Sequence, residues 1–136
     1  MNADVAPMNA DIRRSRLDRI SYAVIGAAQT VSTTLGFGFV EKVYENSLLL
    51  ELAEAGLQVR QQKGIHVQYK GRVVGDFVPD LPVEDAVVVE LKATPALEPN
   101  HRQQCLNYLR ATGMSVCLLL NFGRAKPEVK RIVWNY

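Results

Sequence analysis

Residues 87–92, with the sequence VVVELK, place the strictest constraint on the fold of this chain. Consecutive valines favour a β-strand, because β-branched side chains pack well on a pleated surface. Side chains alternate between the two faces of a strand, so the apolar residues of odd number share one face while Glu90 and Lys92 share the other. The apolar face commits the strand to a core. The charged pair must then lie close to other protein, where charges are costly unless they are paired or bind a metal.

The first part of the chain predicts a tail and two helices. Residues 1–10 are small, polar and unpatterned, so we expect a flexible N-terminal tail ahead of a folded domain over residues 11–136. Apolar residues at spacings of three and four then predict an amphipathic helix that ends near residue 34. They are Leu17, Ile20, Val24, Ile25, Ala28 and Val31, with Ser21 in the same stripe. After a glycine-containing break, a second stripe predicts a helix from about residue 40 that Gly56 ends.

The rest of the chain predicts strands around a third helix. Strand character is found at residues 57–61, 65–69, 72–78, 86–92, 115–121 and 131–134. Turn signals predict that the second and third of these runs form a hairpin, and residues 82–85 are expected to be a connection. A helix is expected around residues 103–110, after the breakers Pro95 and Pro99, with Gly113 at its end. The order α-α-β-β-β-β-α-β-β predicts one α/β domain, a central mixed sheet flanked by helices.

Composition narrows the class of protein. A chain of 136 residues with 48% hydrophobic residues can build one real core, and a net charge of +2 is too small to argue for a polyanionic partner. No apolar run is long enough to cross a membrane, and the N-terminus has no apolar stretch like a signal-peptide core, so we expect a cytoplasmic protein. Cys105 and Cys117 lie in apolar patterns without metal or redox spacing and are expected to be buried thiols.

Asp80, ten residues before Glu90, could join the charged face of residues 87–92 in one site. The turn between them allows their strands to be neighbours, which would bring two carboxylates together. Magnesium prefers such oxygen sites, and a lysine beside the metal can stabilise the charge of a phosphate under attack or orient the attacking water. The same residues could instead form an ordinary cross-strand ion-pair cluster of little energetic value. Spacing alone leaves both interpretations open.

A second motif lies upstream. Residues 38–44, GFVEKVY, fit the pattern G-x-x-E-x-x-Y, which places Glu41 and Tyr44 on adjoining parts of one helix surface. Taken alone, Glu41 is better explained as a solvated first-turn glutamate. With the PD…ELK segment and the segments QCLNYL (104–109) and LNFG (120–123), however, the chain resembles the GxxExxY family of small bacterial and archaeal proteins, placed in the PD-(D/E)xK nuclease superfamily. The resemblance runs from about residue 35 through residue 134.

The resemblance implies a restriction-endonuclease-like fold and a set of site residues. Asp80 and Glu90 would be the principal metal ligands, Glu41 the helix-borne acidic ligand, and Lys92 the catalytic lysine. Gln104 and Tyr108 would belong to a helix that borders the site; they are four residues apart and share one helix face. As simpler alternatives, Gln104 is a solvated polar residue and Tyr108 a core aromatic. Two departures concern the metal site: Asp76 shares strand parity with Asp80 and is the fallback ligand, and Pro82 stands in the turn before ELK.

The function expected from the resemblance is that of a nuclease, a hydrolase of ester bonds dependent on Mg²⁺ or Mn²⁺ and acting on nucleic acid, with DNA as the expected substrate. Local basic residues support contacts to phosphates. They are Arg13, Arg14, Arg16, Arg19, Lys63, Lys70, Arg72, Arg124, Lys126, Lys130 and Arg131. The alternative is a non-catalytic module that keeps the fold and binds nucleic acid or protein.

We expect a chain this short to have no room for a separate target-recognition domain. A lone nuclease of this size must then be unspecific, act as a homodimer, or be guided by a partner in a larger nucleic-acid-processing assembly. A small-ligand binder is a weaker hypothesis, because no phosphate-cradling glycine loop is present. His66 and His101 could be enlisted as further ligands, but each falls near the end of a predicted element and is a minor candidate.

Overall fold

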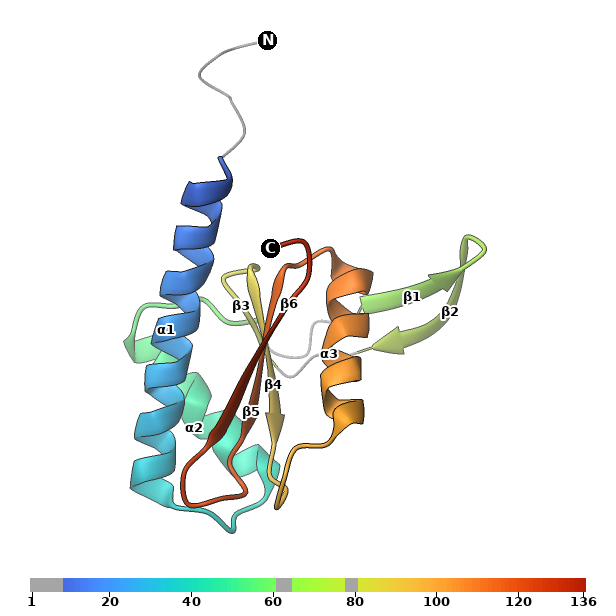
Figure 1. The fold of residues 1–136 in the computed structure, drawn as a ribbon. Coiled ribbons are helices and arrows are strands. Elements are labelled where there is room, and N and C mark those ends of the chain that lie inside the picture. Colours follow the sequence, from blue (N-terminus) through green and yellow to red (C-terminus); the bar gives the residue numbers. More distant parts are fainter. Residues whose placement is uncertain (1–8, 61–64, 78–80) are drawn as a thin grey trace.

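A four-stranded sheet with strand order β3-β4-β5-β6 forms the centre of the protein (Figure 1). The computed structural model describes residues 9–60, 65–77 and 81–136. The strands are β3 (Leu81–Val83), β4 (Val87–Lys92), β5 (Val116–Asn121) and β6 (Glu128–Val133). The central pair β4–β5 is parallel and the two outer pairs are antiparallel. The predicted mixed sheet is therefore confirmed.

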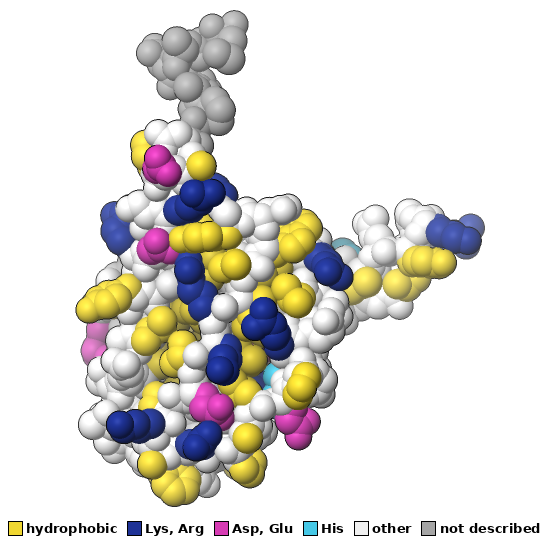
Figure 2. Space-filling view, in the orientation of Figure 1, with side chains coloured by type: hydrophobic (Ala, Val, Ile, Leu, Met, Phe, Trp, Pro, Cys, Tyr) yellow, Lys and Arg dark blue, Asp and Glu magenta, His cyan; other side chains and the backbone are white. Residues whose placement is uncertain are grey.

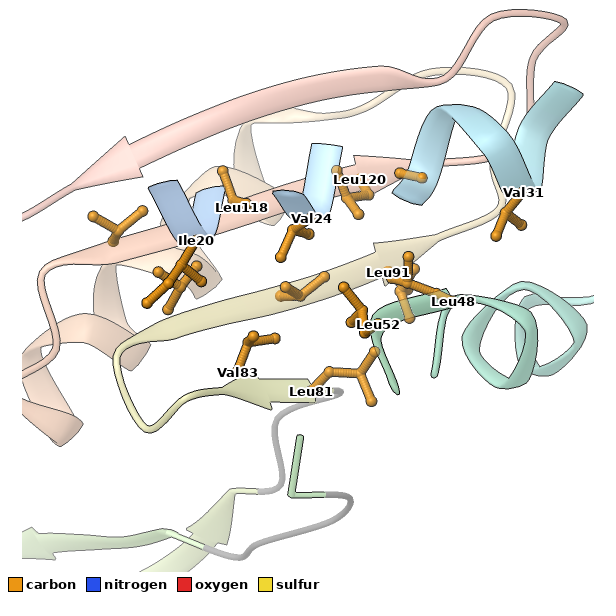
Figure 3. Packing of buried hydrophobic residues seen from close by; sticks show 14 of the residues in the cluster. Ile20, Val24, Val31, Leu48, Leu52, Leu81, Val83, Leu91, Leu118 and Leu120 are labelled. Carbon is orange, nitrogen blue, oxygen red and sulfur yellow. The ribbon is translucent and has the colours of Figure 1, made fainter. Parts of the chain in front are cut away.

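Helices cover both faces of this sheet. Helices α1 (Ala10–Leu35) and α2 (Glu41–Glu54) pack on one face, and α3 (Pro99–Thr112) packs on the other (Figure 1). The larger core lies on the α1–α2 side, where apolar residues of the helices meet the odd-numbered residues of β4, as Leu48 meets Leu91 (Figure 3). Because β4 and β5 are covered on both sides, their sequences are almost continuously apolar. Helix α3 supplies the crossover that parallel strands need.

The strands β1 (Ile65–Tyr69) and β2 (Arg72–Phe77) form a separate antiparallel hairpin beside α3 (Figure 1). The turn residues Lys70 and Gly71 have φ angles of 52° and 74°, a conformation that glycine adopts without strain. The predicted hairpin is confirmed over these residues. Because it makes few contacts beyond α3, the hairpin extends away from the body of the domain.

Two strand predictions were wrong, although the element order was right. The expected strand at 57–61 is, over its described residues, a single bridge from Val59 to Val83, and the expected connection at 82–85 begins with β3 instead. Pro82 is tolerated because its missing N–H would lie on the side of β3 away from β4. On that side Pro82 O accepts a hydrogen bond from Arg60 N. The N–H and C=O of one strand residue point the same way, so the missing N–H of Pro82 faces the outer edge and leaves the β3–β4 ladder intact.

The ends of α1 and α3 follow their predicted signals, whereas the start of α3 does not. Helix α1 ends at Leu35, and Gly113, in the left-handed conformation, caps α3. Pro99, expected as a breaker, instead starts α3, where a missing N–H costs nothing. At the N-terminus Asn9 caps α1 by accepting a hydrogen bond from Ile12 N, and residues 1–8 of the expected tail lie outside the described residues.

Over residues 9–60, 65–77 and 81–136, no helix has both the length and the apolar character to cross a membrane. Cys105 and Cys117 are buried, as predicted, in the core on the α3 side of the sheet.

Candidate active site

Strand β4 holds Glu90 and Lys92 on the face of the sheet that α3 covers. Val88, of the same parity, packs in the α3-side core, so Glu90 and Lys92 point toward the same side. Glu90 is only 8% exposed and its strand partner is the buried Leu119, whereas Lys92, at the end of the strand, is half-buried. A carboxylate thus lies in a largely apolar layer with an ammonium two residues away, as the alternation predicted.

Helix α3 borders this face. Tyr108 is 1% exposed and belongs to the same core cluster as Val88, while Gln104, one turn earlier, is exposed. Both side chains line a cavity of about 310 Å³ between α3 and the hairpin. The structure therefore brings together the α3 residues and the charged face of β4 on one side of the sheet.

Glu41 is the first residue of α2 and is exposed, in the helix layer opposite α3. Its position depends on Tyr44. The Tyr44 hydroxyl donates to Gly36 O at 2.8 Å and accepts from Phe39 N at 3.3 Å, so this side chain closes the loop that leads into α2. The tyrosine of G-x-x-E-x-x-Y thus has a structural role, which is to fix where the helix starts.

The start of α2 is in turn attached to the carboxyl end of the sheet. The Tyr44 ring stacks on Phe122, with centroids 4.8 Å apart and planes at 8°. Phe122, directly after β5, donates its N–H to Lys92 O at 2.8 Å. Helix α2 therefore begins beside the end of β4 where Lys92 lies, although Glu41 approaches from the opposite layer to Glu90.

Sequence reasoning missed Glu45, a second acidic residue of α2. Glu45 is 8% exposed and forms an ion pair with Lys42, one turn after Glu41. The signal was present in the spacing, because residue 45 lies on the same helical stripe as the fully buried Leu48 and Leu52. Its burial adds a carboxylate to the helix face that packs on the sheet.

The sequence also assigned no role to Asn121, which pairs with Lys92 across β4 and β5. Its buried side chain makes four hydrogen bonds. Oδ1 accepts from Thr94 N and Gly123 N, and Nδ2 donates to Thr94 O and to Glu128 Oε1, at 2.9 to 3.0 Å. The amide thereby fastens the residue two positions after Lys92 to the end of β5.

The hydrogen bond from Asn121 lowers the pKa of Glu128 from its ordinary value; burial opposes this shift, while Leu97 N and Arg124 add to it. Gly123 also lies against the backbone of Thr94. A Cβ atom at this position would lie 2.1 Å from Thr94 O, so only glycine allows the two segments to approach this closely.

The remaining expected metal ligands are not assembled by the described residues. Asp80 lies outside them, and Leu81, the residue after it, pairs with Val89 beside Glu90. Within residues 9–60, 65–77 and 81–136, no three His, Cys, Asp or Glu side chains are grouped so that they could hold a metal ion. The fallback ligand Asp76 is on the hairpin, where it forms an ion pair with His66.

The histidines and several basic residues have local tasks in the structure. His101 Nδ1 accepts a hydrogen bond from Glu98 N and so caps α3. Arg13 and Arg14 both donate to Tyr136 O, and Arg131 pairs with Asp18, so basic groups of α1 and β6 tie the last residues of the chain to α1. Lys and Arg side chains nevertheless remain at the surface over α1 and over β6 (Figure 2).

The described residues thus form an α/β domain with a mixed four-stranded sheet, whose central strand carries a buried Glu and a neighbouring Lys. The profile of the PD-(D/E)XK nuclease superfamily matches residues 18–132 of the chain, from within α1 to within β6. The protein therefore belongs to the PD-(D/E)XK nuclease superfamily, whose members typically use divalent metal ions.

Among solved structures, an alkaline exonuclease (LHK-Exo) from Laribacter hongkongensis is similar, with a TM-score of 0.53 and 18% identity. The match covers 98% of this chain and 74% of the exonuclease chain. At this identity the likeness establishes the fold alone, and it agrees with the restriction-endonuclease-like architecture. No curated protein matches the chain.

Proposed function

We propose that the protein is a nuclease of the GxxExxY type that uses Mg²⁺ or Mn²⁺ to hydrolyse phosphodiester bonds in DNA. The observation that carries this proposal is Glu90, a carboxylate with 8% exposure on the face of β4 that also presents Lys92. Burial on a core strand fixes the position of this carboxylate beside Lys92, which favours a functional task such as metal binding. Membership of a nuclease superfamily supplies that task.

The donor set fits a hard divalent cation. Asp80, Glu90 and Glu41 would supply carboxylate oxygens, the ligands that Mg²⁺ prefers and Mn²⁺ accepts. Two features support this set: Leu81 pairs with Val89 next to Glu90, and the Tyr44–Phe122 stack brings the start of α2 to the end of β4. When bound there, the cation would neutralise phosphate charge and lower the pKa of a water nucleophile.

The residues of the chain have separate roles in this proposal. Lys92 would stabilise the negative charge that develops on the phosphate oxygens. This effect is large when the lysine ammonium is held rigidly in a partly dry site. Two hydrogen bonds between the Asn121 amide and the backbone of Thr94, which we call the Asn121 clamp, would supply that rigidity just after Lys92. Gln104 and Tyr108 would border the bound substrate on the α3 side. A homodimer or an assembly with a partner would supply target recognition.

The test is cleavage of end-labelled single- and double-stranded DNA and RNA by the purified protein, with Mg²⁺, with Mn²⁺ and with chelator. Glu90→Gln and Lys92→Ala should each lower the rate by about 10²-fold or more, by analogy with the loss of an electrostatic stabiliser. Matched controls are Glu54→Gln and Arg102→Ala, which change an exposed glutamate and an exposed cation outside the proposed site. Circular dichroism and thermal melting verify that each variant is folded.

Three outcomes are decisive. Metal-dependent cleavage of DNA that the site variants lose and the controls keep supports the proposal. Full activity in Lys92→Ala or Glu90→Gln refutes the site, and preference for RNA refutes the substrate. Folded protein that binds nucleic acid but cleaves none of the substrates would favour the alternative of a binding module that retains the nuclease fold.

A further inference from the structure

A groove runs between helix α3 and strand β1 of the hairpin. It consists of two adjoining cavities of about 310 and 480 Å³, which share Val67, Asn107 and Ala111 and are therefore continuous. Gln104 and Tyr108 complete the smaller cavity, and His66, Gln68 and Arg110 complete the larger one. We call this feature the α3–β1 groove.

The groove lies on the same side of the sheet as the proposed active site. Tyr108, which lines the smaller cavity, packs in the core cluster that contains Val88, and Val88 shares its face of β4 with Glu90 and Lys92. From Tyr108 the lining continues along α3 by one turn to Ala111, with Arg110 beside it. A ligand in the groove would thus lie along α3 on the side of β4 that carries Glu90.

The lining of the groove contains one guanidinium, that of Arg110, and no carboxylate. Beyond the lining, the described residues of the hairpin add Lys70 and Arg72, and helix α3 has no acidic residue. Asp76 is the sole acidic residue of α3 and the described hairpin, and it is engaged by His66. In a chain whose net charge is only +2, this concentration of cations favours a polyanion.

The lining has a mixed chemistry that suits unpaired nucleotides. Val67 and Ala111 offer apolar contact, and the amides of Gln104 and Asn107 offer donors and acceptors for base edges. Gln103 Nε2 donates to Asn107 Oδ1 at 3.0 Å, which holds that amide in place. Arg110, in the larger and more open cavity, suits a phosphate group. Cavities of this size accept groups the size of a nucleotide, whereas a duplex is too wide to enter them.

We propose that the α3–β1 groove binds a single strand of nucleic acid and guides it along α3 to the proposed active site. This inference rests on the proposed nuclease function and specifies the form of its substrate. Arg110 contacts a phosphate, the amides of Gln104 and Asn107 contact base edges, and Val67 with Ala111 contacts the faces of unstacked bases.

The test measures binding without cleavage. Fluorescence anisotropy of a labelled oligothymidylate in chelator gives the Kd of wild-type protein, Arg110→Ala and its matched control Arg102→Ala. Arg102 is an exposed arginine of the same helix that does not line the groove. Losing one phosphate contact on a single strand lowers the magnitude of the slope of log K against log salt by about 0.7. Between 1 M and 0.1 M salt, a tenfold change, this difference in slope amounts to about a fivefold weaker Kd for the variant. We expect this change for Arg110→Ala and not for Arg102→Ala.

A second variant tests the groove by filling it. Ala111→Trp places a large side chain at an exposed helix position that lines both cavities, and Ala125→Trp is the control in an exposed loop outside the groove. Ala111→Trp should weaken single-strand binding at least tenfold with an unchanged melting temperature. Sedimentation of both variants tests whether the groove instead holds a second copy of the chain.

Five outcomes of these binding experiments overturn the inference. It fails if Arg110→Ala and Arg102→Ala have equal effects, if Ala111→Trp binds as the wild type does, or if Ala111→Trp converts a dimer to a monomer. It also fails if the protein binds no oligonucleotide, or if a duplex binds more tightly and loses as much from both variants. Groove-dependent binding by a protein that never cleaves would refute the proposed nuclease instead, and cleavage that Arg110→Ala and Ala111→Trp leave unchanged would refute the groove alone.

Discussion

Asn121 offers the most direct test of how the end of β4 is held. Replacement by alanine removes four hydrogen bonds, three of them to backbone groups of Thr94 and Gly123 in a buried setting. The fourth, to the partly exposed Glu128, can be replaced by water. At about 1 kcal/mol for each of the three backbone contacts, Asn121→Ala should lower the free energy of unfolding by about 3 kcal/mol.

This loss converts to a shift in melting temperature. An unfolding entropy of about 2.1 cal/mol/K per residue, applied to 136 residues, makes 1 kcal/mol equivalent to about 3.5 °C, so the expected fall is about 10 °C. Asn121→Asp is an informative companion, because it keeps the acceptor for Thr94 N and Gly123 N and replaces only the donor. At neutral pH its carboxylate would face Thr94 O and Glu128, so this variant should also be destabilised, and it should recover as acid protonates the new carboxyl group.

Thermal unfolding followed by circular dichroism provides the measurement, with Asn46→Ala as a control at an exposed asparagine of α2. The control should change the free energy of unfolding by no more than about 0.5 kcal/mol. A fall of less than 2 °C (under about 0.6 kcal/mol) for Asn121→Ala would show that water or neighbouring groups replace the amide, and the description of Asn121 as a clamp would then be wrong.

Three further predictions concern the same end of the sheet. Gly123→Ala should destabilise the fold by about 3 kcal/mol or more in thermal melts, because the new Cβ would lie 2.1 Å from a backbone oxygen that cannot rotate away; a neutral result would contradict the close approach. Tyr44→Phe keeps the stack on Phe122 and loses two hydrogen bonds, so denaturant titration should give a loss of about 1–2 kcal/mol, and an unchanged midpoint would mean that the hydroxyl is dispensable. Because the pKa of Glu128 is lowered from 4.5 in the folded protein, its ionised form contributes stability that is present above pH 4.5 and lost as the pH falls through the lowered value; the stability difference between wild type and Glu128→Gln should shrink during that fall, and a difference that stays constant as the pH is lowered below 4.5 would refute this linkage.

The parts of the fold that sequence predicted well are those in which burial repeats with a regular period. The stripe of α1 and the parity of β4 have this character, so the helix bounds and the side of the sheet on which Glu90 lies followed from spacing. Strand β3 could not be found in this way. It has three residues, and Pro82 is a strand breaker by local rules, so its place depends on the outer edge pairing with Arg60, which is a tertiary contact.

The candidate site shows the same division. Glu90 and Lys92 were predicted together because they are two residues apart on one strand. The role of Tyr44 was not, since its hydroxyl bonds to Gly36 O and Phe39 N through a loop shape that no periodic pattern describes. Asn121 lies 29 positions beyond Lys92 and meets it only through the parallel pairing of β4 and β5, although its position after a buried apolar run was a usable signal.

These contacts form one connected support for the proposed active site. Tyr44 fixes the loop before Glu41 and stacks on Phe122, Phe122 bonds to the backbone of Lys92, and Asn121 bonds to Thr94. Glu41 lies in the helix layer on one face of the sheet, whereas Glu90 and Lys92 of β4 point toward the other face, so the carboxyl end of the sheet sets their separation. A site whose ligands are held from both layers tolerates little displacement. Loosening Tyr44 or Asn121 should therefore lower kcat of the proposed nuclease more than it raises KM, even though neither side chain is assigned a contact with substrate.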